Sequence, residues 1–313
     1  MKSTVDTLYI LSAGHCGSTL LDLVLGSHSQ VVSLGEVSFV PSSLVIGKIC
    51  SCGQAMPDCG YWQRLLACMG EKYQQDFWKE PRSLNLGFFN GHRNVDFERL
   101  TRWFKLKRKA QHGLRAAEML LGFPVFKPFT GEFRQGIANT FNYYDCARQA
   151  AGRPFVVDSS KDYIKGISLY QAHPERARLI LLSRDGRGVL HSHLKRDVSR
   201  EYALSAWGDY YQRALPLLRR VVPSEHVLPV RYEDFAADPG KTVQSICQFA
   251  GLTYEPDMLD FANHEHHITE GNDMRMASTS EIRINMAWKK ELKAEDLDCF
   301  EKRLGAVNRS LGY

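Results

Sequence analysis

The stretch of residues 7–25 constrains the fold of this chain more than any other part of it. An apolar run over 8–11 predicts a buried strand, the glycine-containing sequence 14–19 predicts a tight turn, and the leucine-rich run 20–25 predicts a helix. The first amide groups of a helix have no partner inside it, and the helix dipole is positive at that end. The turn is therefore predicted to bind a phosphate or sulfate group.

The turn lacks the lysine of an ATP-binding loop. In the Walker A pattern, a lysine stands directly before the serine or threonine and contacts the outer phosphates of a triphosphate. Here Ser18 and Thr19 follow Gly17 directly, so we expect the loop to bind an anion without binding a triphosphate as an ATPase does. The candidate ligands in the loop are Gly14, His15, Cys16, Gly17, Ser18 and Thr19.

Further apolar runs predict strands that alternate with helices. The expected strands are Leu8–Ser12, Gln30–Ser33, Phe155–Asp158, Arg178–Ser183 and His226–Val230. Each is followed by a loop and a helical stretch, a pattern typical of a mostly parallel sheet. The expected fold class is therefore α/β, a P-loop-like three-layer α/β/α arrangement with a helical insertion. Ligands in such folds lie at the carboxyl ends of the strands.

Length and composition predict one domain over residues 1–313. The net charge of +5 suits an anionic ligand but is too small to predict nucleic-acid binding. No apolar stretch approaches the length of roughly 18 residues that a membrane-spanning helix needs. The amino-terminal residues lead into the glycine loop and do not resemble a cleaved signal, so a cytoplasmic location is expected.

Residues 47–150 interrupt the alternation of strands and helices. Aromatic residues, among them Phe88, Phe89, Trp103 and Phe104, are frequent there, and a basic run covers 102–109. We expect a mostly helical insertion that forms a lid over the site and shapes a pocket for an acceptor. A helical layer with a solvated basic face would explain the basic run equally well.

Three of the eight cysteines cluster within this segment. Cys50, Cys52 and Cys59, with Cys68 as a fourth candidate, allow reduced structural thiols, a local disulfide or a zinc site. The spacing is not that of a Cys-x2-Cys pair, and no histidine lies nearby in the sequence. The crowded histidines in 264–267 do not have the spacing of a helical metal pair either. No metal site is therefore predicted.

A second anion site is predicted where the strand 178–183 ends. Arg184 stands at its carboxyl end, a helix begins near Asp185 or Gly186, and Ser192 lies two turns along it. A guanidinium and a hydroxyl at this spacing suit a second phosphate, although Arg184 could instead pair with Asp185. We expect the nearby histidines at 191 and 193 to be exposed helix residues.

Together these stretches resemble the PAPS-dependent sulfotransferases, of the bacterial type related to the tyrosylprotein branch. The resemblance is carried by the glycine loop, the Arg-Asp-Gly-Arg and His-Ser pieces of 184–192, the Gly-Glu dipeptide at 35–36 and the Ser-Ser-Lys sequence at 159–161. It extends to the cysteine segment, to 228–239 and to 271–275, and it is weakest over 60–150.

The resemblance implies transfer of a sulfuryl group from PAPS to an acceptor hydroxyl, with adenosine 3′,5′-bisphosphate as the product. The glycine loop would hold the 5′-phosphosulfate, and Arg184 with Ser192 would hold the 3′-phosphate. Residues near the nucleotide would be Tyr232, with Arg231 beside it, and Asn272 and Arg275 from the carboxyl-terminal segment. No metal is required by this chemistry, and no partner beyond the acceptor is implied.

The resemblance also implies catalytic residues. Lys161 would contact the bridging oxygen on which negative charge grows, and Glu36 would take the proton of the acceptor. His15 departs from the arginine or lysine that is usual in the family at this place, and it is the alternative base.

Other functions remain open at this point. A divergent P-loop kinase and a non-catalytic nucleotide or sulfate binder are the alternatives to a sulfotransferase. A glycan, a phenol or a lipid-like metabolite would each serve as the acceptor, and the sequence does not indicate an oligomeric state.

Overall fold

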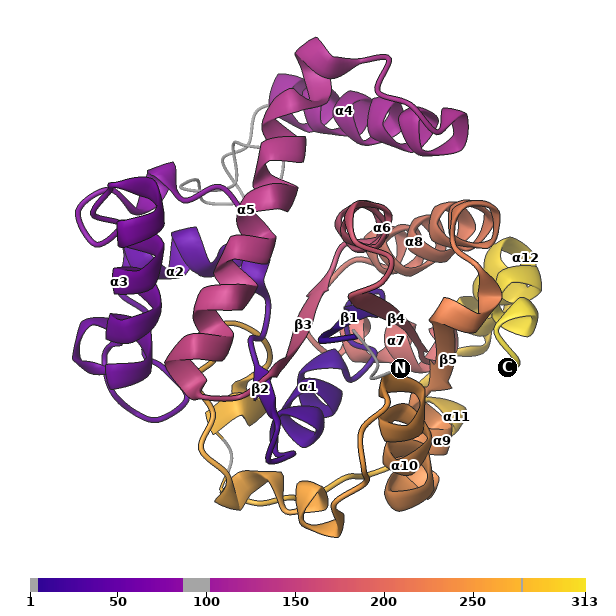
Figure 1. Cartoon of the computed structure of the whole chain (residues 1–313). Helices are drawn as coiled ribbons and strands as arrows, with labels where there is room; N and C mark the ends of the chain where they lie inside the picture. The colour runs from indigo at the N-terminus through magenta and orange to yellow at the C-terminus, as the bar shows by residue number, and fades with distance from the viewer. Residues whose placement is uncertain (1–4, 87–101, 277) are drawn as a thin grey trace.

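A computed structural model describes residues 5–86, 102–276 and 278–313 of the chain (Figure 1). In that part of the chain a five-stranded sheet has the order β2-β3-β1-β4-β5, and every neighbouring pair is parallel. The strands are β1 (Thr7–Leu11), β2 (Val31–Ser33), β3 (Phe155–Lys161), β4 (Ala177–Ser183) and β5 (Val227–Arg231).

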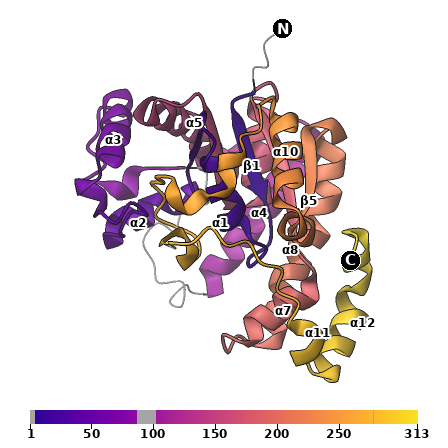
Figure 2. The same ribbon diagram turned by 90° about the horizontal axis from the view of Figure 1, so that it is seen from below.

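Helices cover both faces of the sheet. On one face α1 (Ser18–Gly26) packs beside β2 and β3, and α10 (Pro239–Ala250) packs beside β5. On the other face lie α5 (Lys127–Ala151), α6 (Tyr163–Ala172) and α8 (Arg200–Val221). Figure 2 shows α1 and α10 in front of the strands. The expected three-layer α/β/α fold is confirmed, and each expected strand is present with shifts of only a few residues at its ends.

The remaining elements connect and flank these layers. They are η1 (Val37–Phe39), α2 (Val40–Ile46), η2 (Met56–Asp58), α3 (Gly60–Tyr73), η3 (Pro81–Ser83), α4 (Arg102–Leu121), α7 (Gly186–Leu194), η5 (Ser224–His226), α9 (Tyr232–Ala237), η6 (Pro256–Leu259), η7 (Phe261–Asn263), η8 (Asp273–Met276), α11 (Trp288–Glu291) and α12 (Ala294–Ser310). In the described part of the chain no helix is both long enough and apolar enough to span a bilayer.

The central strand β1 is where the strand order reverses. The chain leaves β1 to form β2 on one side and later forms β4 on the other side. All five residues of β1 are buried, which agrees with its apolar sequence. Ligands of open α/β sheets bind at such a reversal, outside the carboxyl ends of the strands. The glycine loop follows β1 at this point.

Residues 47–150 are helical over most of their described length, with α3, α4 and α5. Because α5 contacts β2 and β3, it belongs to a layer of the sheet. Residues 87–101, with Phe88 and Phe89, lie outside the described residues, as do the side chains of Trp103 and Phe104 and most of the basic run. The role of this segment as an insertion and lid stays a prediction.

A buried charge cluster supports the sheet beside the glycine loop. Asp158 of β3 is fully buried, and its carboxylate lies 3.4 Å from Lys165 Nζ and accepts a 2.6 Å hydrogen bond from the Tyr144 hydroxyl. It also accepts a hydrogen bond from the backbone N–H of Ser160. Removing a partner would leave a buried charge unpaired, which would lower the stability of the fold. The cluster therefore fixes how α5, α6 and β3 pack.

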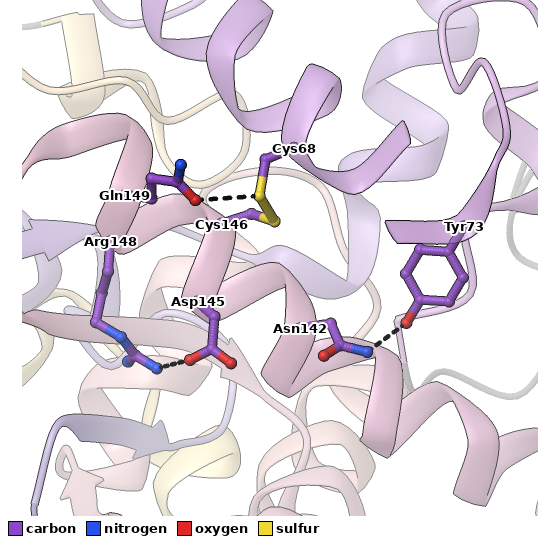
Figure 3. Close-up of a disulfide and its surroundings, with 7 residues drawn as sticks. All are labelled: Cys68, Tyr73, Asn142, Asp145, Cys146, Arg148 and Gln149. Atoms are coloured by element: carbon purple, nitrogen blue, oxygen red, sulfur yellow. Dashed lines mark hydrogen bonds and ion pairs between the residues drawn. A yellow bond between two sulfur atoms is a disulfide. The ribbon is translucent and has the colours of Figure 1, made fainter. Parts of the chain in front are cut away.

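A disulfide joins α3 to α5 (Figure 3). It pairs Cys68 with Cys146, so Cys68 is not a fourth member of the cysteine cluster. Local sequence patterns do not predict this pairing, because 78 positions separate the two residues. Near the disulfide, the Asn142 amide donates a 2.7 Å hydrogen bond to the Tyr73 hydroxyl, a second link between the same two helices.

The disulfide is expected to stabilise the oxidised chain. Closing a loop of this length removes conformational entropy from the unfolded chain, worth about 4.5 kcal/mol in the chain-entropy model. Cys68→Ser should therefore lower the free energy of unfolding, measured with urea, by up to that amount without a reductant. In the presence of a phosphine reductant the variant and the parent protein should unfold alike. Equal stability under oxidising conditions would contradict the prediction.

Candidate functional site

A cavity of about 390 Å³ lies at the carboxyl ends of the central strands. It is lined by Gly14, His15, Gly17, Ser18, Thr19, Leu20, Glu36, Lys161, Arg184, Ser192, Arg196, Tyr232, Gly271, Asn272 and Met274. These residues come from the ends of β1, β3 and β4, from the loop after β2, from α1 and α9, from α7 and the turn after it, and from the carboxyl-terminal segment. The fold thus brings most of the candidate residues to one place.

The glycine loop turns sharply into α1. Gly17 precedes the helix with a φ of 88°, a left-handed conformation that side chains rarely adopt. A Cβ at Gly17 would lie 2.5 Å from the ring of Tyr232, so glycine is also needed for close packing. The helix begins at Ser18, and its first amide groups lack partners within the helix. The loop therefore offers amide donors and the positive end of a helix dipole to an anion.

His15 has an unusual backbone and an uncharged ring. Its φ is 63°, and its ring packs edge-on against His193 at 4.3 Å between ring centres. Burial first, and then the charges of His193 and Arg196, lower the pKa of His15 to about 4. The ring is therefore neutral at pH 7 in the free protein. A bound anion would favour the protonated ring and raise this pKa.

Arg184 braces the loop from the end of β4. Its guanidinium donates a 3.0 Å hydrogen bond to the carbonyl of His15 and lies over the ring of Tyr232, 4.9 Å from the ring centre. Asp185 pairs with Arg187 at 2.8 Å, and no ion pair joins the two described residues Arg184 and Asp185. The guanidinium lines the cavity and retains donors for a ligand.

The helix α7 contributes two residues to the cavity. Ser192 lines it as expected, and Arg196 just beyond the helix lines it as well. Sequence reasoning missed Arg196. Helical spacing from Ser192 does not identify it, because Arg196 lies in the turn after α7. Arg184, Ser192 and Arg196 together add two guanidinium groups and a hydroxyl to the lining of the cavity.

Glu36 and Lys161 form an ion pair at the cavity. Lys161 Nζ donates to Glu36 Oε1 over 2.5 Å, and both side chains are largely buried. The side chain of Glu36 makes no capping hydrogen bond to the following helix, and its partner is the amine of Lys161. Lys161 has a φ of 70°, the second non-glycine lining residue with a left-handed backbone. Such strain is often found at functional sites.

Backbone hydrogen bonds hold this ion pair in place. The N–H of Ser159 donates to the carbonyl of Gly35 at 2.9 Å, and the N–H of Ser38 donates to the hydroxyl of Ser160 at 3.1 Å. The Tyr210 hydroxyl donates a 2.6 Å hydrogen bond to the carbonyl of Lys161. The two side chains therefore stand on segments fixed to the end of the sheet.

The carboxyl-terminal segment lies against the start of α1. The N–H of Asn272 donates a 3.1 Å hydrogen bond to the Thr19 hydroxyl, and a Cβ at Gly271 would lie 2.8 Å from that hydroxyl oxygen. Gly271, Asn272 and Met274 thereby line the cavity. The family resemblance predicts that this segment lies near the nucleotide. In the structure it covers one side of the glycine loop.

Some candidate residues do not line the cavity. Cys16 is buried behind the loop, with its thiol 3.6 Å from the Tyr211 hydroxyl, and burial raises the pKa of Cys16 to about 11. Arg275 donates to the carbonyl of Ile49 at 3.0 Å. Arg231 lies over the ring of Tyr313, away from the cavity. These residues can influence the site only through the segments they hold.

The histidines of α7 are not exposed helix residues. His191 and His193 are each only 7% exposed. His191 Nε2 lies 2.9 Å from a Glu291 carboxylate oxygen, and His193 supports the ring of His15. The expectation of exposure was wrong because α7 is covered by α8, α11 and α12.

Comparisons with known proteins agree with this fold. A family model described as "Sulfotransferase family" matches residues 78–256. No curated protein matches the chain. The sulfotransferase domain of an olefin synthase from Synechococcus is 20% identical with a TM-score of 0.53, covering 99% of this chain and 95% of that one. A sulfotransferase from Mycobacterium avium is 12% identical with a TM-score of 0.48, covering 98% and 77%.

The titration of His15 tests the electrostatics of the cavity. In the free protein we expect its ring to titrate with a midpoint near pH 4, because burial and neighbouring cations disfavour the charged form. Saturation with adenosine 3′,5′-bisphosphate should raise this midpoint. The measurement is NMR of isotope-labelled histidine, with His15→Asn to identify the resonance. A midpoint near 6.5 in the free protein, or one that bisphosphate leaves unchanged, would contradict the assignment.

Proposed function

The chain belongs to the sulfotransferase family, and from this premise we propose that it transfers a sulfuryl group from PAPS to an acceptor hydroxyl. The observation that carries the proposal is the single cavity shared by two anion-binding features. One is the glycine loop with the start of α1, and the other is the group formed by Arg184, Ser192 and Arg196. A donor with anionic groups at its 5′ and 3′ positions needs two such features.

The charge of the cavity favours an anionic donor. Lys161, Arg184 and Arg196 line it with positive charge, and Glu36 is the carboxylate among the lining residues. Because Arg184 also contacts the loop through the carbonyl of His15, it joins the two anion-binding features. In the proposal Arg184, Ser192 and Arg196 hold the 3′-phosphate, while Ser18, Thr19 and the loop amides hold the 5′-phosphosulfate. Tyr232 and Asn272 border the nucleotide.

Two paired residues have the chemistry for in-line transfer. Glu36 takes the proton of the acceptor hydroxyl as its oxygen forms a bond to sulfur. The bond between sulfur and the bridging oxygen breaks, and Lys161 with the loop amides stabilises the negative charge that develops on that oxygen. The ion pair holds the Glu36 carboxylate and the Lys161 amine side by side in the cavity.

His15 is the less suitable base in this arrangement. With a pKa of about 4 its neutral ring has a weak affinity for a proton in the free protein. It can donate one ring N–H to the sulfonate group in its neutral form. The proposed role of His15 is therefore donor binding. The proposed acceptor is a glycan, a phenol or a lipid-like metabolite, and the proposed location is cytoplasmic.

Ligand binding tests the donor assignment. We expect adenosine 3′,5′-bisphosphate to raise the melting temperature, with a stabilisation of about 2.7 kcal/mol at a hundredfold excess over Kd. ATP with magnesium should stabilise the protein much less. Arg184→Ala should weaken bisphosphate binding roughly tenfold to hundredfold, because a hydrogen bond to a charged group contributes about 1.5–3 kcal/mol.

Arg231→Ala is the matched control for this experiment. Arg231 also stands at the carboxyl end of a strand, but its guanidinium packs on Tyr313 outside the cavity. Its replacement should leave bisphosphate affinity within about twofold of the parent protein, a change smaller than 0.5 kcal/mol. Stabilisation by ATP with magnesium alone would favour the kinase alternative. Equal affinity in the Arg184 and parent proteins would overturn the role of Arg184.

Replacement of Glu36 tests the proposed base. Glu36→Gln should bind bisphosphate with undiminished affinity, because it removes a negative charge from the cavity. Loss of the general base should lower kcat roughly hundredfold to ten-thousandfold. Transfer of radiolabelled sulfate from PAPS would be followed with an acceptor selected from phenols, glycans and lipids on the parent protein. Unchanged turnover in Glu36→Gln would assign the base to another group, and His15→Asn would then be measured in the same assay.

A further inference from the structure

Three thiols and one imidazole meet outside the proposed active site. Cys50, Cys52, Cys59 and His267 each direct one ligand atom to a common point, and these atoms all lie within 4.8 Å of one another. Cys59 Sγ lies 3.7 Å from Cys52 Sγ, 3.9 Å from Cys50 Sγ and 3.3 Å from His267 Nδ1. Cys50 Sγ lies 3.7 Å from the same nitrogen. Four of the six distances among these atoms are therefore 3.3–3.9 Å, and the other two are no longer than 4.8 Å.

The four distances of 3.3–3.9 Å are close to those of a tetrahedral metal site. A zinc ion with bonds of about 2.3 Å to sulfur and about 2.0 Å to nitrogen places neighbouring sulfur atoms about 3.8 Å apart. It places sulfur and nitrogen about 3.5 Å apart by the same geometry. The sulfur atoms are too far apart for a disulfide, in which they are about 2.05 Å apart. The three residues are free cysteines, in contrast to Cys68 and Cys146.

The cysteines stand on a tightly bonded turn. A bridge pairs Ile49 with Ala55, and the N–H of Cys50 donates to the carbonyl of Gln54 at 2.9 Å. The N–H of Gly53 donates back to the carbonyl of Cys50 at 2.9 Å. Cys59 directly precedes α3. The thiols are therefore held by fixed backbone, which reduces the entropy lost when they bind an ion.

His267 is oriented toward the thiols. Its ring stacks on Tyr61 with an angle of 8° and a distance of 4.8 Å between ring centres. Nδ1 faces the sulfur atoms, and Nε2 lies 3.6 Å from a carboxylate oxygen of Glu265. A carboxylate near the second ring nitrogen is a frequent arrangement at metal-bound histidines, because it fixes the ring and increases its basicity.

We propose that Cys50, Cys52, Cys59 and His267 bind one zinc ion in a closed tetrahedral site. Three thiolates and an imidazole are a ligand set that selects zinc over magnesium or calcium. All four positions are taken by protein, so the site is structural and leaves no position for water or substrate. The cysteines lose their protons on binding, and these protons pass to the solvent.

The zinc ion would tie the carboxyl-terminal segment to the cysteine turn. Ser51 and Ile268 are already joined by two hydrogen bonds, from Ser51 N to the Ile268 carbonyl at 2.9 Å and from Ile268 N to the Ser51 hydroxyl at 3.0 Å. Ile268 packs on Gly35, next to Glu36. Asn272 follows a few residues later and contacts Thr19 of the glycine loop. The zinc site would not itself line the cavity. It would hold in place the carboxyl-terminal segment, which does line it.

Metal content and stability test this proposal independently of any transferase activity. The protein is purified with a phosphine reductant and without chelators, and its metals are measured by mass spectrometry. We expect one zinc ion per chain. Cys59→Ser and His267→Asn should lose most of it, whereas Cys299→Ser, which removes a free thiol on α12, should retain it. Removal of zinc by a strong chelator should lower the melting temperature of the parent protein but not that of a folded Cys59→Ser.

Cobalt substitution keeps the test valid if a variant does not fold. Cobalt(II) added to the metal-free parent protein should give the thiolate charge-transfer band and the intense visible bands of a tetrahedral site. In Cys52→Ser, whose thiol is only partly buried, these bands should weaken. A folded parent protein without stoichiometric zinc that gives no such bands with cobalt overturns the proposal. Zinc that is retained equally by Cys59→Ser and His267→Asn overturns it as well.

Discussion

The turn between β1 and α1 is the constraint on which the rest of the site depends. Two residues in this turn, His15 and Gly17, have left-handed backbone conformations, and the chain then enters α1 with its amide groups directed at the cavity. Glycine at position 17 is required both by this conformation and by the ring of Tyr232. Arg184 and Thr19 connect the turn to β4 and to the carboxyl-terminal segment. Parts of the chain that are distant in sequence are thus arranged around one short loop.

Charge in the cavity is distributed among separate elements. Lys161 comes from β3, Arg184 follows β4, and Arg196 follows α7. The charge of Lys161 is balanced locally by Glu36, whereas Arg184 and Arg196 stand on different elements, and the packing of those elements brings their charges to the cavity. His15 contributes no further positive charge while its ring is neutral. A cavity with this charge gains free energy from binding an anion.

Much of the fold and of the cavity followed from local sequence patterns. The strands and the glycine loop were predictable because apolar runs and turn residues act over short distances, and Arg184 and Ser192 were predictable from their place after a strand. The burial of His193 and the pairing of Cys68 with Cys146 were not, since both depend on helices that pack from elsewhere in the chain. His267 meets Cys59 across 208 positions, so spacing in the sequence could not place them together.

The cross-link between α3 and α5 also has a consequence for motion. The two helices share a covalent bond and a hydrogen bond from Asn142 to Tyr73 (Figure 3). In the oxidised chain, a displacement of α3 therefore pulls on α5. Because α5 packs on β2 and β3, such a displacement also strains the contact between α5 and the sheet. Opening on this side of the molecule would therefore be a movement of one two-helix body, and its amplitude would be limited by the sheet.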